Sequence, residues 1–387
     1  VYLDGAGSGA AVVDAMALVD PGITDTLAEV LVAGNTTGGT NLVVDSGDTL
    51  DVNGPLDANG TIKLDGNYPT GTSNVALGNT ALDSVESGGS YNVAIGEAAL
   101  TSLTTGDNNV AVGYIALQDI TTGNENTAVG VGALGDTTTG NNNVALGRSA
   151  MRANTTGGSN VAIGADALDA NTTASNNVAI GRSALGANVL GSRIVAIGYN
   201  ALLAANPSSA SDVYNVAIGY NAGKSITTGD SSTLIGGLAG DALTTGSRNV
   251  AVGMQSLSAA TTGGNNVAMG YQALVSSTTA SYNTAIGSGA LDANTTGTNN
   301  TSIGAISLSG NTTASNNTAV GYQTLYANTT GDYQTAVGRG ALGANTTGVQ
   351  NTAVGGLALD ANTTASYNSA VGYNALGANT TGADNTA

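Results

Sequence analysis

Hydrophobic and polar positions recur in this chain with a period of seventeen residues, from Val75 to the end of the sequence. Nearly every repeat opens with Val or Thr, then Ala, an aliphatic residue and Gly; the exceptions are Ser369 at position 1 and Leu234 and Ser302 at position 2. The eighth position is Leu or Met in all but two repeats. The spacing is constant except after Val75, where one extra residue is inserted, and after Val195, where four are inserted. A disordered linker has no reason to keep aliphatic residues in one register over such a length. The pattern therefore indicates a folded repeat array.

The period predicts a parallel β-solenoid. A 3.6-residue period is absent, and the Gly and β-branched content argues against helix, which leaves short strands joined by turns. Seventeen residues at about 3.3 Å each trace roughly 56 Å, enough for one closed turn, and such turns stack at about 4.8 Å. We therefore predict an all-β fold in which residues 72–387 form an elongated shaft with one 17-residue coil per repeat.

Alternation along the predicted strand gives an expected core. Positions 1 and 3 of the repeat share a face, so we expect their Val and Ile side chains inside and the Ala of position 2 outside. Leu at position 8 should enter the core from the next face, and each buried aliphatic side chain contributes roughly 1.5 to 3 kcal/mol. The expected core residues are Ile95, Val112, Ile163, Ile180, Ile197, Leu100, Leu168, Leu185 and Leu274.

The Gly of position 4 marks a corner of the coil, where a side chain would clash or φ must be positive. The expected corner glycines are Gly96, Gly113, Gly164, Gly181 and Gly270. Position 17 is usually Asn, and stacking makes this row a candidate amide ladder; the alternative is that Asn merely suits a turn. Stacking also explains the scarcity of charge, because like charges about 5 Å apart repel.

Residues 1–71 differ from the repeats and are expected to form an attachment or trimerisation region. Thr24 to Asn35 has the apolar spacing and capping pattern of a short helix, although a strand is the alternative. Gly54, Gly60 and Gly66 follow at six-residue spacing. Six residues span only about 20 Å, one face of a prism, so three chains would be needed to close an intertwined coil. This spacing favours a parallel homotrimer over a loose run of strands.

Composition excludes several classes of function. The chain has 387 residues, no Cys, no His and a formal charge of -18, so the common general base, thiol nucleophile and soft metal ligands are missing. An acidic surface disfavours nucleic acid and anionic lipid, and no apolar run is long enough to span a membrane. Scattered carboxylates such as Asp166, Asp292 and Asp360 form no evident facing pair. We expect no enzymatic activity, no cofactor, no catalytic residue and no metal site.

Three surface features are candidates for binding. From Tyr220 onward a tyrosine occupies position 5 of every third repeat, at Tyr220, Tyr271, Tyr322 and Tyr373, and Tyr114 and Tyr199 stand in the same row. These rings could stack on sugar rings if exposed, although duplication of a three-coil block explains the same spacing. The insertion around Asn206 to Asp212 should bulge from the shaft as a loop. Asn-x-Ser/Thr sequences recur with the repeat and are potential glycosylation acceptors, or simply repeats: Asn154, Asn171, Asn294, Asn328, Asn345, Asn362 and Asn379.

Several segments resemble those of bacteriophage tail fibres and related virion appendages. They are IVAIGYNAL (194–202), TTGSRNVAVG (244–253), NTAVGYQTL (317–325) and TLAEVLVAGNTTGGTNLVVDSGD (26–48). More loosely, the repeats resemble those in the heads of trimeric autotransporter adhesins, although the repeat here is longer. The resemblance implies a trimeric β-rich shaft in a virion appendage or at an extracellular surface, with a host glycan or receptor as a further partner.

The leading hypothesis is therefore a structural fibre that positions a host-recognition tip, and the alternative is a cell-surface adhesin or extracellular filament. An ice-binding solenoid is a third class, because rows of Thr can order water. Adjacent Thr residues in a strand point to opposite faces, however, so the Thr-Thr pairs do not give a double row.

Overall fold

The computed structural model of the chain describes residues 71–86 and 88–387. The expected helix at residues 24–35 and the glycines at six-residue spacing lie outside these residues, as does all but the last residue of the predicted N-terminal region.

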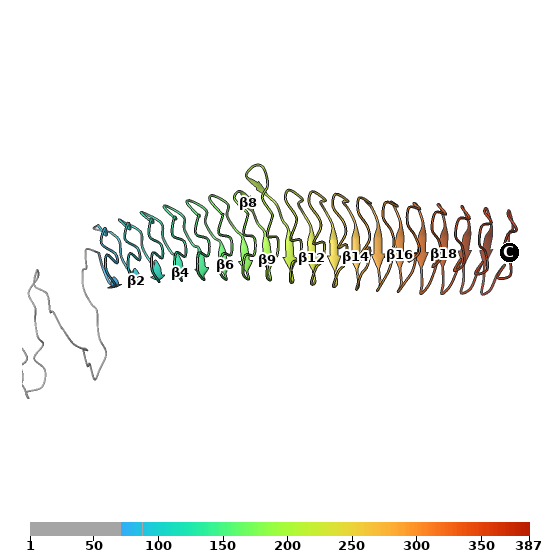
Figure 1. Cartoon of the computed structure of the whole chain (residues 1–387), viewed down its shortest axis with the longest axis horizontal. Helices are drawn as coiled ribbons and strands as arrows, with labels where there is room; N and C mark the ends of the chain where they lie inside the picture. The colour runs from blue at the N-terminus through green and yellow to red at the C-terminus, as the bar shows by residue number, and fades with distance from the viewer. Residues whose placement is uncertain (1–70, 87) are drawn as a thin grey trace, which may run out of the picture. The chain divides into compact units, whose positions relative to one another are not determined.

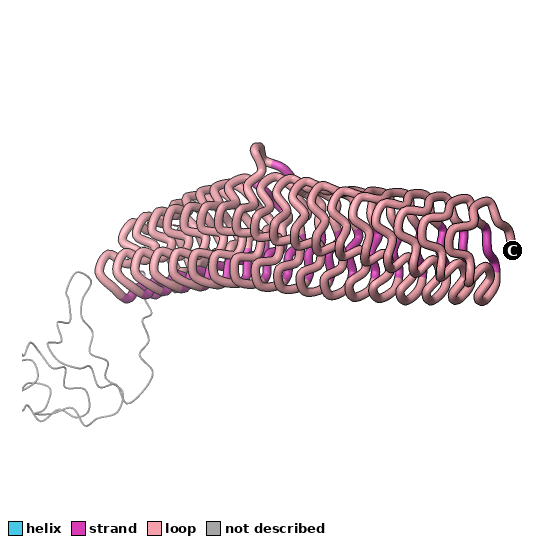
Figure 2. Tube along the Cα trace, turned by 45° about the vertical axis from the view of Figure 1, so that its right-hand side comes forward, coloured by secondary structure: helices cyan, strands magenta, loops and turns pink. Residues whose placement is uncertain are grey.

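The described residues form the predicted parallel β-solenoid (Figure 1). Positions 1 to 3 of each repeat are a three-residue strand that pairs in parallel with the strand of the next coil, position on position. The strands are β1 (Val75–Leu77), β2 (Val93–Ile95), β3 (Val110–Val112), β4 (Thr127–Val129), β5 (Val144–Leu146), β6 (Val161–Ile163), β7 (Val178–Ile180), β9 (Val195–Ile197), β11 (Val216–Ile218), β12 (Thr233–Ile235), β13 (Val250–Val252), β14 (Val267–Met269), β15 (Thr284–Ile286), β16 (Thr301–Ile303), β17 (Thr318–Val320), β18 (Thr335–Val337), β19 (Thr352–Val354) and β20 (Ser369–Val371). The strands line one side of the stack, and turns and loops make up the rest of each coil (Figure 2).

Hydrogen bonds join neighbouring coils on every side, and not only along the sheet. In the coil of β6, the Gly164 N–H donates back to Leu146 O at 2.7 Å, and the Leu168 N–H donates forward to Ala184 O at 3.0 Å. On the return side of the same coil, the Asn176 N–H donates back to Gly158 O at 3.1 Å. The turns are therefore tied from coil to coil as the strands are, which satisfies backbone groups that loops of this length would otherwise leave unpaired.

The core is built from positions 2, 7 and 8, so the predicted orientation of the strands is wrong. At position 2, Ala94, Ala111, Ala162, Ala179 and Ala196 are completely buried. The position 3 residues expected in the core lie on the outer face: Ile95 is 37% exposed, and Val112, Ile163, Ile180 and Ile197 are half-buried. The expected core leucines Leu100, Leu168, Leu185 and Leu274 are completely buried.

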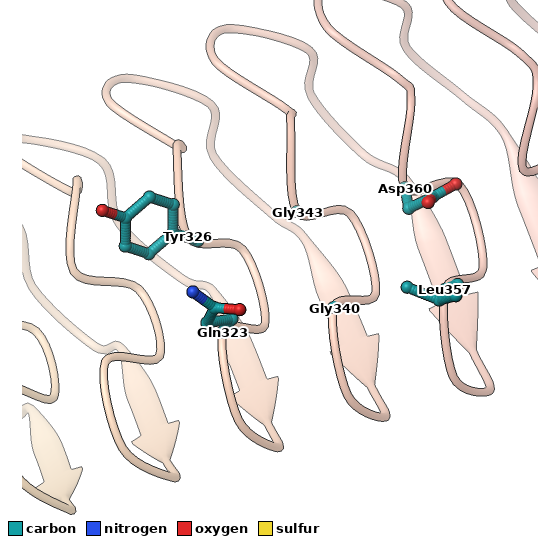
Figure 3. A pocket seen from close by; sticks show the side chains of 6 residues that line it. All are labelled: Gln323, Tyr326, Gly340, Gly343, Leu357 and Asp360. Carbon is teal, nitrogen blue, oxygen red and sulfur yellow. The ribbon is translucent and has the colours of Figure 1, made fainter.

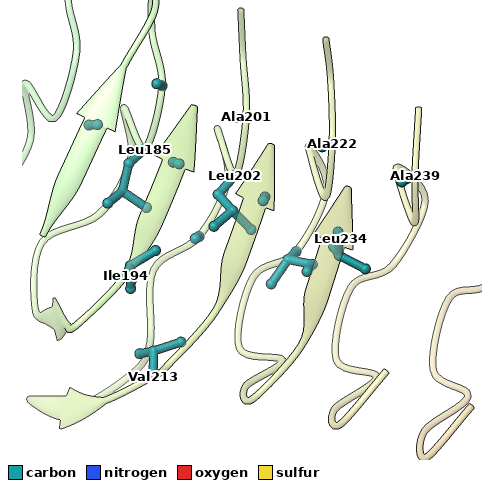
Figure 4. Packing of buried hydrophobic residues seen from close by; sticks show 14 of the residues in the cluster. Leu185, Ile194, Ala201, Leu202, Val213, Ala222, Leu234 and Ala239 are labelled. Carbon is teal, nitrogen blue, oxygen red and sulfur yellow. The ribbon is translucent and has the colours of Figure 1, made fainter. Parts of the chain in front are cut away.

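The reason for this orientation is the thinness of the coil, whose two walls lie too close for a branched side chain at position 2 opposite Leu at position 8. One coil shows this directly. Leu234 occupies position 2 of β12, and position 8 is Gly in its own coil and in the coil before it, Gly240 and Gly223. A Cβ added to Gly223 would lie 2.7 Å from Leu234 Cδ1, and one added to Gly240 would lie 3.0 Å from Leu234 Cδ2. Leu234 therefore fills the space that two missing leucines leave (Figure 4).

Left-handed residues turn the chain at several points of each coil. The position 4 glycines have positive φ, as expected, and a Cβ on Gly96 would lie 2.5 Å from Gly113 O. Three further positions, 6, 8 and 16, are also left-handed although few of them hold Gly. In the coil of β6 they are Asp166 (φ 57°), Leu168 (φ 52°) and Asn176 (φ 61°). A bulky residue seldom takes this conformation, so packing and hydrogen bonds hold Leu168 there.

The asparagines of position 17 form the predicted amide ladder inside the core. Asn109 is completely buried. Its amide donates to Asn92 Oδ1 at 3.1 Å and to Gly123 O at 2.9 Å, and its carbonyl accepts the Asn126 N–H at 3.0 Å. A second ladder, at position 11, was not predicted; there each amide donates to the preceding Oδ1 at 2.8 to 3.2 Å, along Asn294, Asn311, Asn328, Asn345 and Asn362.

Candidate functional site

Tyr114 and Tyr199 also stand at position 5, and the four tyrosines at 51-residue spacing are exposed on the corner that follows the strand. Their exposed fractions are 58% for Tyr220, 49% for Tyr271, 47% for Tyr322 and 79% for Tyr373. They stand three coils apart, about 14 Å, so they do not make one continuous platform. Tyr220 instead stacks on Tyr199 of the preceding coil, with ring centroids 5.6 Å apart, and Arg182 lies over Tyr199 at 6.0 Å. The structure therefore brings together Arg182, Tyr199 and Tyr220, a group that the 51-residue spacing does not reveal.

A notch of about 260 Å³ opens on the adjacent side of the coils of β17, β18 and β19. Its floor is the coil of β18, where Gly340 and Gly343 stand at positions 6 and 9. Gln323 and Tyr326 lie on one side of it (Figure 3). The other side is lined by Leu357 and Asp360. Two glycines at these positions of one coil are the sequence signal that marks the notch.

The notch offers the chemistry that suits a sugar ring. Tyr326 is 46% exposed and presents an aromatic face, on which the apolar face of a pyranose can stack. The Gln323 amide and the Asp360 carboxylate supply a donor and acceptors for hydroxyl groups. The volume of the notch lies just below the range of pockets that hold drug-sized ligands.

The insertion after β9 projects from the stack as a loop, as the sequence predicts (Figure 1). At its base β8 (Gly191–Ser192) pairs in parallel with β10 (Ser211–Asp212). Arg193 forms an ion pair with Asp212 and lies over the Tyr214 ring at 5.9 Å. The Tyr214 hydroxyl donates to Asp212 Oδ2 at 3.2 Å. This cluster fastens the loop to the coil of β7 below it.

Burial removes most of the potential glycosylation sites in the folded chain. The side chains of Asn154, Asn171, Asn294, Asn328, Asn345 and Asn362 are completely buried in the position 11 row, where an attached glycan has no room. Asn379, in the terminal coil, is half-buried. In these coils the Asn of each Asn-Thr-Thr sequence is therefore a core residue, and the two Thr residues belong to the turn that follows.

Most Thr-Thr pairs expose one residue of the two; Thr227–Thr228 and Thr380–Thr381 expose both. The position 12 threonine is half-buried in most coils, and its hydroxyl donates to a carbonyl of the next coil, as Thr295 does to Thr312 O at 3.0 Å. The position 13 threonine, such as Thr296, is exposed. Threonine hydroxyls therefore line the surface in a single row, which weakens the ice-binding hypothesis.

The carboxylates lie apart on the surface of the coils. Asp166 forms an ion pair with Arg148 of the preceding coil at 2.7 Å. Burial, and next the charge of Asp166, raise the pKa of Asp169 above its ordinary value. Within residues 71–86 and 88–387, no three acidic side chains are placed so that they could hold a metal ion. Asp292 and Asp360 lie four coils apart, so these two carboxylates are not brought together.

Comparison with known proteins gave no match among family models, curated proteins or solved structures. In the part of the chain that the structure describes, no helix has the length and apolar character needed to cross a membrane.

Proposed function

We propose that this chain is the shaft of a fibre on a phage or similar particle, which holds a host-recognition element away from the body. The observation that carries this proposal is the unbroken, in-register stack of eighteen strands. Seventeen steps of about 4.8 Å give a length of roughly 80 Å. A stack of this length provides reach, and its surface carries few of the reactive groups that catalysis needs.

The buried polar rows support a mechanical role. Each amide of the position 17 row bonds to a neighbouring coil, and so do the threonine hydroxyls of position 12. Bending or shearing the stack would break many such bonds at once, and buried polar groups without partners are costly. The position 17 row therefore resists deformation along most of the described length, and the position 11 row adds to it in the coils of β5 to β7 and from β15 onward.

The proposal includes self-association of the chain into a homotrimer. The proposed location of this trimer is a virion appendage or another extracellular surface. A host-surface glycan is the proposed ligand of the shaft itself. The notch beside Tyr326 favours this second role, because it combines an exposed aromatic ring with an amide and a carboxylate.

Immuno-electron microscopy tests the location. Antibodies raised against the purified chain should label thin projections on virus particles from the source culture. Labelling confined to cell surfaces would replace the phage fibre with the adhesin or filament, and labelling of the cell interior alone would contradict both.

A glycan array tests the ligand. The intact protein should retain a subset of immobilised saccharides, and Tyr326→Ala should lose them. Tyr333→Ala is the matched control, because Tyr333 belongs to the same coil and is 60% exposed but does not line the notch. Equal binding by both variants would remove the notch from the proposal.

A further inference from the structure

The outer face of the sheet carries an uninterrupted aliphatic row. Position 3 is Val, Ile, Leu or Met in all eighteen strands, and these side chains point away from the core. Leu77 is 47% exposed, Met269 41% and Ile303 38%. Position 1, on the same face, is Val, Thr or Ser throughout. No charged residue occupies either position, although both face outward in a chain of formal charge -18. We call this surface, positions 1 and 3 of β1 to β20 without β8 and β10, the strand face.

The strand face is too large for a surface that stays in water. The sheet contains eighteen strands. At about 4.8 Å per strand the face is roughly 85 Å long, and at about 3.3 Å per residue it is about 10 Å wide. Its projected area is thus about 850 Å² and includes Thr or Ser at position 1 of eight strands; the largest apolar patch on an ordinary monomer is about 300 to 600 Å². A stable interface takes about 800 Å² from each partner, so the strand face is large enough to form one.

From this surface we infer that the strand face is the interface through which copies of this chain pack side by side. The inference rests on the proposed shaft and names the surface that builds it. A second copy is the partner that fits, because it presents the same aliphatic row with the same rise per coil over the same length. A globular partner would cover only a few coils, and nothing would then keep position 3 aliphatic in the others.

The polarity of position 1 indicates a parallel arrangement. From β15 to β19 position 1 is Thr in every strand, while in the earlier strands it is Val except in β4 and β12. Parallel packing sets the Thr-bearing segment against the same segment of the second copy, where threonine hydroxyl groups can hydrogen-bond with one another. Antiparallel packing would bury these hydroxyl groups against Val, which leaves polar groups without partners.

Sedimentation of a charge-bearing variant tests the interface. The intact protein should sediment as a dimer or trimer, and Ile286→Asp with Ile303→Asp should lower its mass toward that of one chain while the circular dichroism spectrum is kept. Thr296→Asp with Thr313→Asp is the matched control, because these two exposed threonines of the position 13 row belong to the same two coils. An unmodified protein that sediments as a monomer overturns the inference, and so does equal dissociation of both variants.

Cysteine cross-linking gives a second test that needs no charge in the interface. The chain has no Cys, so Ile303→Cys introduces a single thiol. A disulfide requires Cβ atoms about 3.5 to 4.5 Å apart. Two copies that overlap along their whole length therefore link at residue 303 in a parallel, in-register pair, whereas an antiparallel pair would set β16 against β5. Oxidation should give covalent dimers for Ile303→Cys and none for Thr313→Cys. The absence of dimers for Ile303→Cys would overturn the parallel arrangement.

Failure of the interface and failure of the shaft are distinguishable. Monomeric rods on labelled virus projections would leave the shaft standing without this interface. Cross-linked oligomers that label no projection would keep the interface and remove the proposed role.

Discussion

Removing one rung of the position 17 ladder should loosen the coils on both sides of it. In Asn109→Ala, Gly123 O loses its donor and the Asn126 N–H loses its acceptor, and both groups are buried in the ladder. Stranding a buried polar group costs about 1 to 3 kcal/mol, so the two together cost about 2 to 6 kcal/mol. The vacated amide volume adds to this loss.

The loss should be local, because each coil touches only its neighbours. Long repeat arrays also depart from two-state unfolding, so a single melting temperature is a poor measure. Amide hydrogen exchange followed by mass spectrometry is the better assay. A loss of about 2 kcal/mol at the rung corresponds to about thirty-fold faster exchange, since about 1.4 kcal/mol is tenfold. We expect this acceleration in the coils of β2 to β4 and little change beyond β6.

Two further variants make the assay decisive. Thr122→Ala removes an exposed side chain of the position 13 row, and exchange should be unchanged. Asn109→Leu keeps the side-chain volume but not the hydrogen bonds, and should be about as damaging as Asn109→Ala. If Asn109→Leu restores protection, the amide row only fills space, and the ladder does not stabilise the stack through its hydrogen bonds.

Three further predictions follow from the same coil geometry. Leu168→Ala should lower the local stability of the coil of β6 by about 2 to 5 kcal/mol, measured by amide hydrogen exchange on the monomeric chain, and Ile163→Ala should lower it by less, because Ile163 is half-buried. Equal losses would contradict the observed orientation of the strand. Gly181→Ala should disrupt its coil, because the new Cβ would lie 2.5 Å from Gly198 O at φ 126°, while Ser183→Gly, at φ 55°, should raise stability by up to about 1 kcal/mol, both read by hydrogen exchange. Burial, followed by the charge of Asp166, raises the folded-state pKa of Asp169, so the intact chain loses stability as pH rises through that pKa. Asp169→Asn should therefore slow amide hydrogen exchange in the coil of β6 at neutral pH, relative to the unmodified chain at the same pH, and the gain should disappear below about pH 3.8, the ordinary value. A gain that persists well below that pH would show that the charge of Asp169 is not its cause.

The sequence determines the coil, its length and its register because stacking places like on like. A constant step of seventeen with a fixed Gly and a fixed Leu leaves little freedom for the path of the chain. It predicts the position of every strand of the eighteen-stranded sheet, the corner glycines and the leucine layer, but not the short pair β8 and β10. The inserted loop follows from the single long step after Val195.

Alternation alone could not show which side chains of the strand point into the core, because either of the two alternating sets can face inward. Choosing the set by hydrophobicity puts Val and Ile inside, and the structure shows the reverse. The residue sizes at position 2 nevertheless indicated the orientation. The side chain there is larger than Ala or Ser only at Leu234, which lies beside Gly223 and Gly240. The left-handed leucines were equally hidden, because Leu168 has a φ of 52° that no local propensity favours.

The candidate site was less predictable than the fold, because it depends on side chains that are missing from single coils and on contacts between neighbouring coils. The tyrosine spacing located exposed rings but not the Tyr199 and Tyr220 stack, which joins consecutive coils across the insertion. The notch arises because Gly340 and Gly343 remove two side chains from one coil. Its walls belong to the coils on either side, so only the three-dimensional stack brings Gln323, Tyr326 and Asp360 together.

The one apolar residue in the position 17 row of the described coils shows how closely local sequence follows the stack. Asn177 donates to Gly191 O, fourteen residues ahead, at 2.9 Å. An asparagine at residue 194 would need the corresponding carbonyl in the coil of β9, but the inserted loop displaces that part of the chain. Residue 194 is instead Ile, completely buried, and Val213, 5% exposed, follows the loop (Figure 4). Where the insertion removes the acceptor, an apolar pair replaces the amide, because an amide without a partner is worse than none. The exceptions in this sequence are thus compensated coil by coil, as Leu234 is by two glycines, and such local compensation is what keeps a stack of this length in register.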